Sequence, residues 1–259
     1  MKIASFNING VKARLPALLD WLRGAAADVV VLQELKCIDD AFPRLEIEEM
    51  GYNIETHGQK GFNGVAILSK LPLEDVSRGL PGHDGDDQAR WIEATVTGAR
   101  PIRVCGLYLP NGNPAPGPKY DYKLAWMDRL KARAAALIAA EESAVLLGDY
   151  NVIPESIDCW DPAVWALDAL FLPDTRAAFR RITHLGLTDA LRAVDQSPGM
   201  YTFWDYQAGA YQKNHGIRID HVLLTPQAAD RLDTCGTDAE TRGRDKPSDH
   251  VPIWVNLDL

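Results

Sequence analysis

The sequence has no long hydrophobic run, and its apolar stretches fall short of the roughly 18 to 20 residues that a membrane-spanning helix needs. It opens with "MKIASFNING", which has neither the extended apolar core nor the small-residue cleavage site of a signal peptide. Low-complexity tracts and short repeats are also missing. We therefore expect a cytoplasmic globular protein that has no membrane partner.

Cysteine is scarce, and its spacing argues against two classes of site. The chain has four cysteines, and no two of them form a C-x-x-C pair: Cys37, Cys105, Cys159 and Cys235. This pattern predicts neither a structural zinc site nor a redox motif, and we expect reduced, mostly buried thiols.

Positive charge is in deficit, with 27 Lys and Arg against 36 Asp and Glu and a net charge of -9. Nucleic-acid binding usually favours a basic surface, so the total argues against such a partner at first sight. A deep site that holds several carboxylates for a divalent cation would also make the total acidic, while basic residues could still line its rim. A DNA partner is therefore not excluded, and nothing in the sequence indicates an obligate protein partner.

The remaining composition, 46% hydrophobic and 24% charged, is typical of a globular domain. Apolar runs separated by turn residues predict strands, and spacing of leucines predicts helices. We expect strands over 2–8, 28–34, 64–70, 89–97, 102–110, 145–151, 201–206, 217–225 and 251–259, and helices over 13–26 and 119–140. No linker of different composition divides the chain, so we expect one domain, 1–259, in which two packed sheets are flanked by helices.

The segment "VLLGDYN" runs from a buried strand directly into Asp149 and Asn151. If the strand continues to its end, residues i and i+2 share a face and both polar side chains point the same way. The alternative is an Asx turn that leaves the strand, because Asp and Asn are good turn formers. This segment alone leaves both interpretations open.

Polar residues recur at or near the ends of the other predicted strands as well. Singly, each has a structural explanation: Asn7 could close a turn, and Asp220 could pair with Arg218. Together they predict a convergent site, because an acid within a strand is costly unless it is paired or binds a metal. The set is rich in oxygen donors, which suits Mg²⁺ or Mn²⁺ and metal-assisted hydrolysis of a phosphate ester: Asn7, Glu34, Tyr108, Asp149, Asn151, Asp220, Asp249 and His250.

Eight blocks of sequence, in order along nearly the whole chain, carry a family resemblance. They are "KIASFNINGVKAR", "DVVVLQELK", "GFNGVAILSK", "GLYLPNGNP", "LLGDYNVIP", "YTFWDY", "GIRIDHVLL" and "SDHVPIWV". The chain resembles the bacterial exonuclease III family of apurinic/apyrimidinic endonucleases, within the endonuclease/exonuclease/phosphatase superfamily. The resemblance implies an α/β fold: a four-layered α/β sandwich of two packed mixed sheets flanked by helices.

The resemblance also implies a metal site. Glu34 matches the principal ligand, and Asn7 and Asp249 match the positions that complete the metal and phosphate site. Asp149 and Asn151 are further candidates for ligands. Asn9 stands where some relatives carry aspartate, which leaves the number of metal ions open.

Catalytic roles follow in the same way. Asp149 matches the residue that orients or deprotonates the attacking water, and Asn151 is its neighbour in the motif. The resemblance therefore implies that the two side chains share a strand face, because both must reach one phosphate. His250 matches a histidine that contacts the phosphate, Asp220 the carboxylate that orients it, and Tyr108 a tyrosine that hydrogen-bonds the scissile phosphate. Asp220 beside His250 should raise the pKa of the imidazole and favour its cation.

Substrate-binding residues are implied by two further blocks. An apolar pocket that accepts a flipped-out abasic sugar is expected from Phe203, Trp204, Ile217 and Ile219, although Trp204 and Ile219 could equally be ordinary core. Ile217 stands where some relatives carry tryptophan, so one wall is smaller. Contacts with the DNA backbone are expected from Lys36, Asn111 and Lys119.

The predicted function is therefore DNA repair. The enzyme would cut double-stranded DNA 5′ to abasic sites, leave a 3′-hydroxyl, remove 3′ blocking groups and act as a 3′–5′ exonuclease. One alternative is another metal-dependent phosphodiesterase or phosphatase of the superfamily, acting on RNA or on lipid phosphates. The other is a non-catalytic DNA-binding protein on the same fold.

Overall fold

Two six-stranded sheets form the centre of the structure, a computed structural model that describes residues 1–259. The first sheet has the order β11-β12-β1-β2-β4-β3 and the second the order β5-β6-β7-β8-β10-β9. The first contains β1 (Lys2–Asn7), β2 (Val29–Gln33), β3 (Asn53–His57), β4 (Val65–Ser69), β11 (Leu232–Thr237) and β12 (Ile253–Leu257). The second contains β5 (Leu73–Arg78), β6 (Trp91–Val96), β7 (Ile102–Tyr108), β8 (Ala144–Asp149), β9 (Thr188–Asp189) and β10 (Asp220–Leu224).

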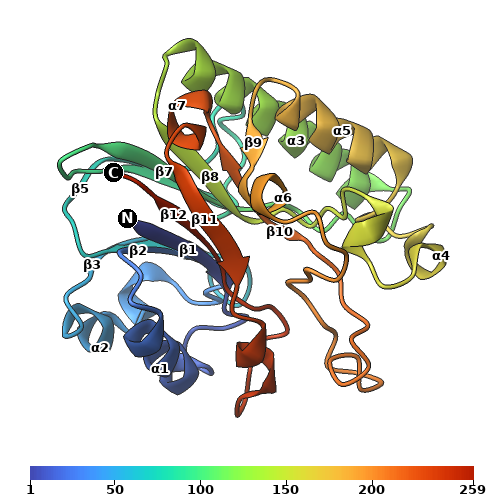
Figure 1. Ribbon diagram of the computed structural model, residues 1–259, viewed down its shortest axis with the longest axis horizontal. Coiled ribbons are helices and arrows are strands. Elements are labelled where there is room, and N and C mark those ends of the chain that lie inside the picture. Colours follow the sequence, from blue (N-terminus) through green and yellow to red (C-terminus); the bar gives the residue numbers. More distant parts are fainter.

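Some helices cover the outer faces of the two sheets, and others lie at the edge of the molecule or against the core between the sheets (Figure 1). They are α1 (Leu15–Ala25), α2 (Arg44–Glu48), α3 (Pro118–Ala139), α4 (Pro162–Trp165), α5 (Pro173–Thr183), α6 (Ala190–Val194) and α7 (Pro226–Ala229). Leu18 and Trp21 of α1 pack on the first sheet, while Trp126 of α3 and Phe179 of α5 pack on the second. The layers are helix, sheet, sheet and helix, so the predicted α/β sandwich is confirmed. No helix combines the length and the apolar character that crossing a membrane would require.

The central strands are apolar on both faces because each lies between a helix layer and the other sheet. In β2 and β4 all residues are buried, and both are rich in β-branched or aliphatic side chains. Val29 and Val31 face the second sheet, and Val30 and Leu32 face α1. This double burial explains why the sequence shows these strands as continuous hydrophobic runs.

The predicted strands differ from the structure mainly at the edges of the sheets. Four strands were not predicted from the sequence: β3, β5, β9 and β11. All four are edge strands, and β5 has no buried residue. The predicted strand over 201–206 is wrong: Phe203 makes only isolated bridges, one to Ile217 and one to His250. For the same reason β10 starts at Asp220 and not at 217, because the preceding residues belong to this irregular pairing.

Strand direction gathers the polar residues at one end of the two sheets. β1 and β2 are parallel neighbours in the first sheet, as are β7 and β8 in the second. Tyr108 and Asp149 are register partners at the ends of β7 and β8, and Asp220 opens β10 opposite Asp149. Open α/β sheets place their sites at such strand ends, and here the ends of both sheets meet.

Candidate active site

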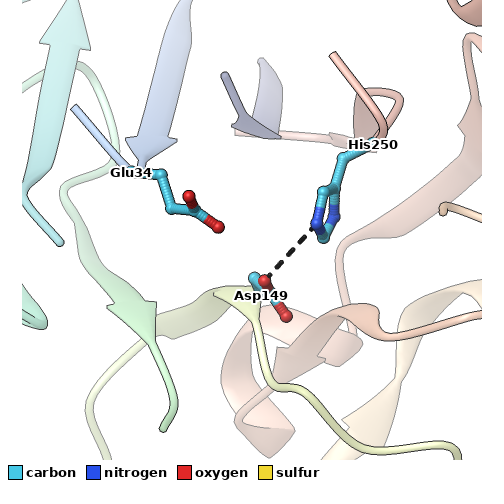
Figure 2. A group of neighbouring side chains, drawn as sticks. All are labelled: Glu34, Asp149 and His250. Carbon is cyan, nitrogen blue, oxygen red and sulfur yellow. Dashed lines mark ion pairs between the residues drawn. The ribbon is translucent and has the colours of Figure 1, made fainter. Parts of the chain in front are cut away.

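Carboxylates from the two sheets meet at the amide of Asn7. Asn7 Nδ2 donates to Glu34 Oε1 and to Asp149 Oδ2, both at 3.0 Å, and its Oδ1 accepts from the backbone N–H of Asn9 at 3.1 Å. Glu34 follows β2 with a left-handed φ of 53°, which turns its side chain out of the strand. Figure 2 shows Glu34, Asp149 and His250 pointing toward one centre, and their ligand atoms all lie within 4.8 Å of one another.

Asp149 reaches this centre because β8 ends in a special local geometry. Gly148 has a φ of 156°, and a Cβ there would lie 1.9 Å from the carbonyl oxygen of Leu107, so β7 and β8 approach closely only with glycine. After Asp149 the chain leaves the sheet: Asn151 has a φ of 48°, and its backbone N–H donates to Asp149 Oδ1 at 2.8 Å. This is the Asx turn, so the prediction of a shared strand face is wrong, although both side chains do line one cavity.

His250 is held between two carboxylates. Its Nδ1 lies 2.9 Å from Asp220 Oδ2, and its Nε2 lies 3.7 Å from Asp149 Oδ2. Burial disfavours the imidazolium, but the negative charges of Asp220 and Asp149 outweigh burial and raise the pKa of His250 to about 10. At neutral pH the ring is therefore a cation with a donor on each nitrogen, as the sequence analysis expected from Asp220.

Asp220 does not pair with Arg218, which excludes the alternative that the sequence left open. The guanidinium of Arg218 donates to Asp158 Oδ1 at 2.7 Å and to Asp189 Oδ2 at 2.8 Å. Arg218 is 1% exposed, and it also lies 3.0 Å from His221 Nδ1. This buried network fixes the chain immediately before Asp220 and so supports the position of His250.

The electrostatics of the carboxylates differ between the two sheets. Burial raises the pKa of Asp149 to about 7, against the lowering effect of His250. Burial also tends to raise the pKa of Glu34, but hydrogen bonds from Asn7 and Lys36 lower it overall. Burial and the charges of Glu34 and Asp149 raise the pKa of Tyr108 well above its ordinary value, so its hydroxyl stays protonated as a donor.

The donor set fits a hard divalent cation. Glu34 offers partly buried and Asp149 buried carboxylate oxygens, and a divalent cation would offset the burial that raises the pKa of Asp149. His250 is the third residue of the group, but as a cation it offers no lone pair from either nitrogen. Asp249 lines the same cavity and accepts from Asn9 Nδ2 at 2.9 Å. Asn7 lies between the candidate ligands as a donor to both.

The cavity beside these residues has a volume of about 200 Å³ and one apolar wall. The wall combines expected residues with new ones, and its members are Trp165, Leu170, Phe203, Ile217 and Ile219. The prediction that Trp204 lines the pocket is wrong. Trp204 lies in a separate buried cluster with Tyr201 and Val251, and its Nε1 donates to Asn214 Oδ1 at 3.2 Å.

A chain of amides also lines the cavity. Asn111 Nδ2 donates to Asn151 Oδ1 at 3.1 Å, and Asn151 Nδ2 donates to the carbonyl oxygen of Leu109 at 2.9 Å. Asn113 Nδ2 continues the chain toward α4 by donating to both Asn111 Oδ1 and Asp168 Oδ1 at 3.0 Å. Five further residues line the cavity and were not predicted from the sequence, because none of them follows a buried apolar strand: Asn113, Trp165, Asp168, Leu170 and Asp205.

The expected backbone-contacting lysines lie outside the cavity. Lys36 Nζ is 2.9 Å from Glu34 Oε2 and also donates to Asn9 Oδ1, so it stands at the rim beside the first sheet. Lys119 lies beyond Asn111 in a second hollow, which also contains Arg90. The roles of these residues, like those of the catalytic and metal-binding residues, stay predictions.

Comparison with known proteins agrees with this geometry. A family model described as "Endonuclease/Exonuclease/phosphatase family" matches residues 4–250. An exodeoxyribonuclease III of Haemophilus influenzae is 34% identical over 99% of this chain and 100% of that protein. The structure of the Neisseria 3′ phosphatase NExo bound to a product DNA hairpin aligns with a TM-score of 0.96 at 38% identity. The structure of an AP endonuclease from Archaeoglobus fulgidus aligns with a TM-score of 0.94 at 37% identity. Both alignments cover 100% of this chain and 100% of the other.

Proposed function

The chain belongs to the endonuclease/exonuclease/phosphatase family, and on this premise we propose that it is a DNA-repair phosphodiesterase. It would cut the backbone of double-stranded DNA 5′ to abasic sites and act at 3′ ends as a 3′-phosphodiesterase and 3′–5′ exonuclease. The observation that carries the proposal is the geometry of His250, whose Nε2 lies 3.7 Å from Asp149 Oδ2 beside a cavity with one apolar wall. Its substrate would be chromosomal DNA, which in a bacterial cell lies in the cytoplasm.

Asp149 and His250 would divide the work of hydrolysis. Asp149 would orient the attacking water and accept its proton, because it is a carboxylate enclosed in the cavity beside His250. His250 would donate from Nε2 to a phosphoryl oxygen, because Asp220 occupies its Nδ1. Asp220 therefore keeps the ring both charged and aimed.

Neutral donors would complete the phosphate site. Tyr108 lines the cavity with a protonated hydroxyl, and Asn151 lines it from the turn after β8. Both can stabilise charge that develops on the phosphoryl oxygens without adding positive charge themselves. Glu34 and Asp149, with Asp249 at the cavity, would hold the divalent cation, for which we propose Mg²⁺ or Mn²⁺. When bound, the cation supplies positive charge to the phosphate and lowers the pKa of water.

Substrate choice would depend on the apolar wall. An abasic sugar has no base to hydrogen-bond, so apolar contacts from Phe203, Ile217 and Ile219 suit it better than polar ones. Trp165 adds bulk to the same wall, next to the position where Ile217 is small. A cavity of about 200 Å³ is small for a ligand site, which suits a sugar that has lost its base.

The test uses a duplex that carries one abasic-site analogue and a 5′ label, beside an undamaged duplex. Each is incubated with Mg²⁺ or with EDTA. The protein is compared with the Asp149→Asn variant and with Asp195→Asn, a matched change at a partly exposed acid that does not line the cavity. We expect a metal-dependent cut at the lesion by the protein and by Asp195→Asn, and a loss of about 10²-fold or more for Asp149→Asn. Absence of metal-dependent cleavage of either duplex would contradict the proposal.

A further inference from the structure

A lysine occupies a core position of α3. The buried face of this helix packs on the second sheet through residues that include Trp126, Met127 and Leu130. Lys123 lies on the same face, three residues before Trp126, and its side chain is completely buried. Lysine is almost never buried to this extent unless it is paired. The position therefore indicates a role that an aliphatic side chain could not fill.

The partners of Lys123 are backbone carbonyls, not carboxylates. Its Nζ donates to the carbonyl oxygen of Asn111 at 3.0 Å and to that of Asn151 at 2.5 Å, and no Asp or Glu forms an ion pair with it. Burial lowers the pKa of Lys123 to about 7, against the charges of Asp149 and Asp168, which raise it. The amine and the ammonium form both have at least two N–H groups, so the two hydrogen bonds persist in either form.

These two carbonyls belong to the loops that leave the central strands of the second sheet. Asn111 follows β7 and Asn151 follows β8, so Lys123 ties both loops to α3. Gly112 leaves room for the stem of the lysine: it has a φ of 91°, and a Cβ there would lie 2.6 Å from Lys123 Cδ. The helix and the loop are therefore both adapted to this contact.

The side chains of the same two residues form a fixed pair in the candidate active site. Asn151 Oδ1 accepts from Asn111 Nδ2 at 3.1 Å, and Asn151 Nδ2 donates to the carbonyl oxygen of Leu109 at 2.9 Å. Asn111 Oδ1 accepts from the backbone N–H of Asn113 at 3.2 Å. These bonds determine which end of each amide carries the N–H groups, and they leave one N–H of each amide without a protein partner. Both residues line the cavity, so two neutral donors remain for a phosphoryl oxygen.

We propose that Lys123 is a positioning residue of this site. By holding the backbone of Asn111 and Asn151, it keeps their two free N–H groups where charge develops on the phosphoryl oxygens during hydrolysis. The effect of a misplaced donor is large, because a shift of about 1 Å can cost about 10²-fold in rate. This inference rests on the proposed function, because it takes a phosphodiester as the substrate of the cavity.

The experiment compares Lys123→Met, which keeps most of the side-chain length and removes the donor, with Leu137→Ala, a control in the same helix. Leu137 is buried about four turns further along α3, so its loss destabilises the helix without removing a contact to either loop. The constants kcat and KM are measured with Mg²⁺ on the duplex that carries an abasic-site analogue, at a temperature at which circular dichroism shows every variant folded. We expect kcat of Lys123→Met to fall about 10- to 100-fold with KM within about threefold, and kcat of Leu137→Ala to stay within about twofold.

A double-mutant cycle identifies the residue through which Lys123 acts. Asn151→Ala removes one of the two donors, so Lys123→Met should cost several-fold less in kcat in the Asn151→Ala background than in the unchanged protein. Lys123→Gln has the length of Lys123→Met but keeps two N–H groups, so it should retain several-fold more activity. A purely structural role would instead give losses that multiply in the double variant.

Nuclear magnetic resonance gives a reading that needs no substrate. The side-chain amide signals of Asn111 and Asn151 should shift or broaden in Lys123→Met and stay unchanged in Leu137→Ala. If the unchanged protein cleaves no duplex while these signals do move, the proposed function fails and the positioning of the two amides stands.

Three outcomes would overturn the inference. The first is a kcat of Lys123→Met within about twofold of that of the unchanged protein. The second is a loss in Lys123→Met that is equal in both backgrounds of the cycle. The third is a set of amide signals from Asn111 and Asn151 that stays the same in Lys123→Met.

Discussion

Replacing Arg218 by methionine should destabilise the protein more than any change to a surface ion pair. Arg218 is 1% exposed and donates to Asp158 at 2.7 and 3.1 Å and to Asp189 at 2.8 Å. Burial tends to lower the pKa of Arg218, but the two carboxylates outweigh it and raise the pKa further. The guanidinium is therefore a permanent cation enclosed by its partners.

The magnitude follows from what Arg218→Met leaves behind. Asp158 keeps its ion pair with Arg192 at 2.5 Å, but Asp189 has no second Arg or Lys partner and is left as an unpaired, half-buried carboxylate. Breaking one partner of a buried pair costs about 3–5 kcal/mol. At about 2–4 °C per kcal/mol for a domain near this size, the melting temperature should fall by roughly 6–20 °C.

The assay is urea and thermal unfolding of Arg218→Met beside Arg78→Met. Arg78 makes an equally short pair with Glu55, at 2.6 Å, but its side chain is 42% exposed, so its loss should cost about 0–1 kcal/mol. The reasoning would be refuted if the two variants differed by less than about 1 kcal/mol in free energy of unfolding. Restoring stability with Asp189→Asn in the Arg218→Met background would support the unpaired carboxylate as the cause.

Three further predictions concern the site and its surroundings. Asp220→Asn removes the carboxylate 2.9 Å from His250 Nδ1, so the pKa of His250 should fall from about 10 toward its ordinary value of about 6.5. The cleavage rate of this variant should then decline between about pH 7 and 9, where the rate of the unchanged protein stays level. A pH–rate profile of both proteins checks this. Burial first, and Arg218 second, lower the pKa of His221 to about 4. Below about pH 6.5 the unfolded chain protonates His221 and the folded chain does not, so the free energy of unfolding should fall by up to about 3 kcal/mol between pH 6.5 and 4. Urea titrations at the two pH values should show a smaller fall for His221→Gln. Trp165→Ala removes the bulk beside Ile217, so cleavage of undamaged 3′ ends should rise several-fold relative to cutting at an abasic analogue. Both rates are measured on one doubly labelled duplex. A ratio of the two rates equal to that of the unchanged protein would show that Trp165 does not restrict the cavity.

The sequence predicted the layers and the strand ends because burial on both faces leaves a strong pattern. The run "DVVVLQE" can only be a central strand, and a polar residue that follows such a run is conspicuous. Glu34, Tyr108 and Asp149 could be found in this way, and His250 from its place before the last strand; the structure brings all four to one cavity.

Residues outside this pattern could not be found from the sequence. Trp165 lies in a helix of four residues, and it packs against the cluster that contains Ile217, a residue far away in the sequence. Trp204 resembles a pocket residue in sequence, but the irregular pairing of Phe203 with Ile217 and His250 turns it to the other side. The partners of Arg218 lie 29 and 60 residues away, so no local spacing could indicate them.

The amide of Asn7 has a consequence for the time at which activity can appear. It joins Glu34, which follows β2, to Asp149, which ends β8 in the other sheet, while His250 stands immediately before β12. β1, the first strand to be synthesised, pairs with β12, the last, so the first sheet is complete only when β12 has been made. A growing chain on the ribosome therefore carries no partial nuclease, and cutting begins only when the residues around His250 have been made and docked.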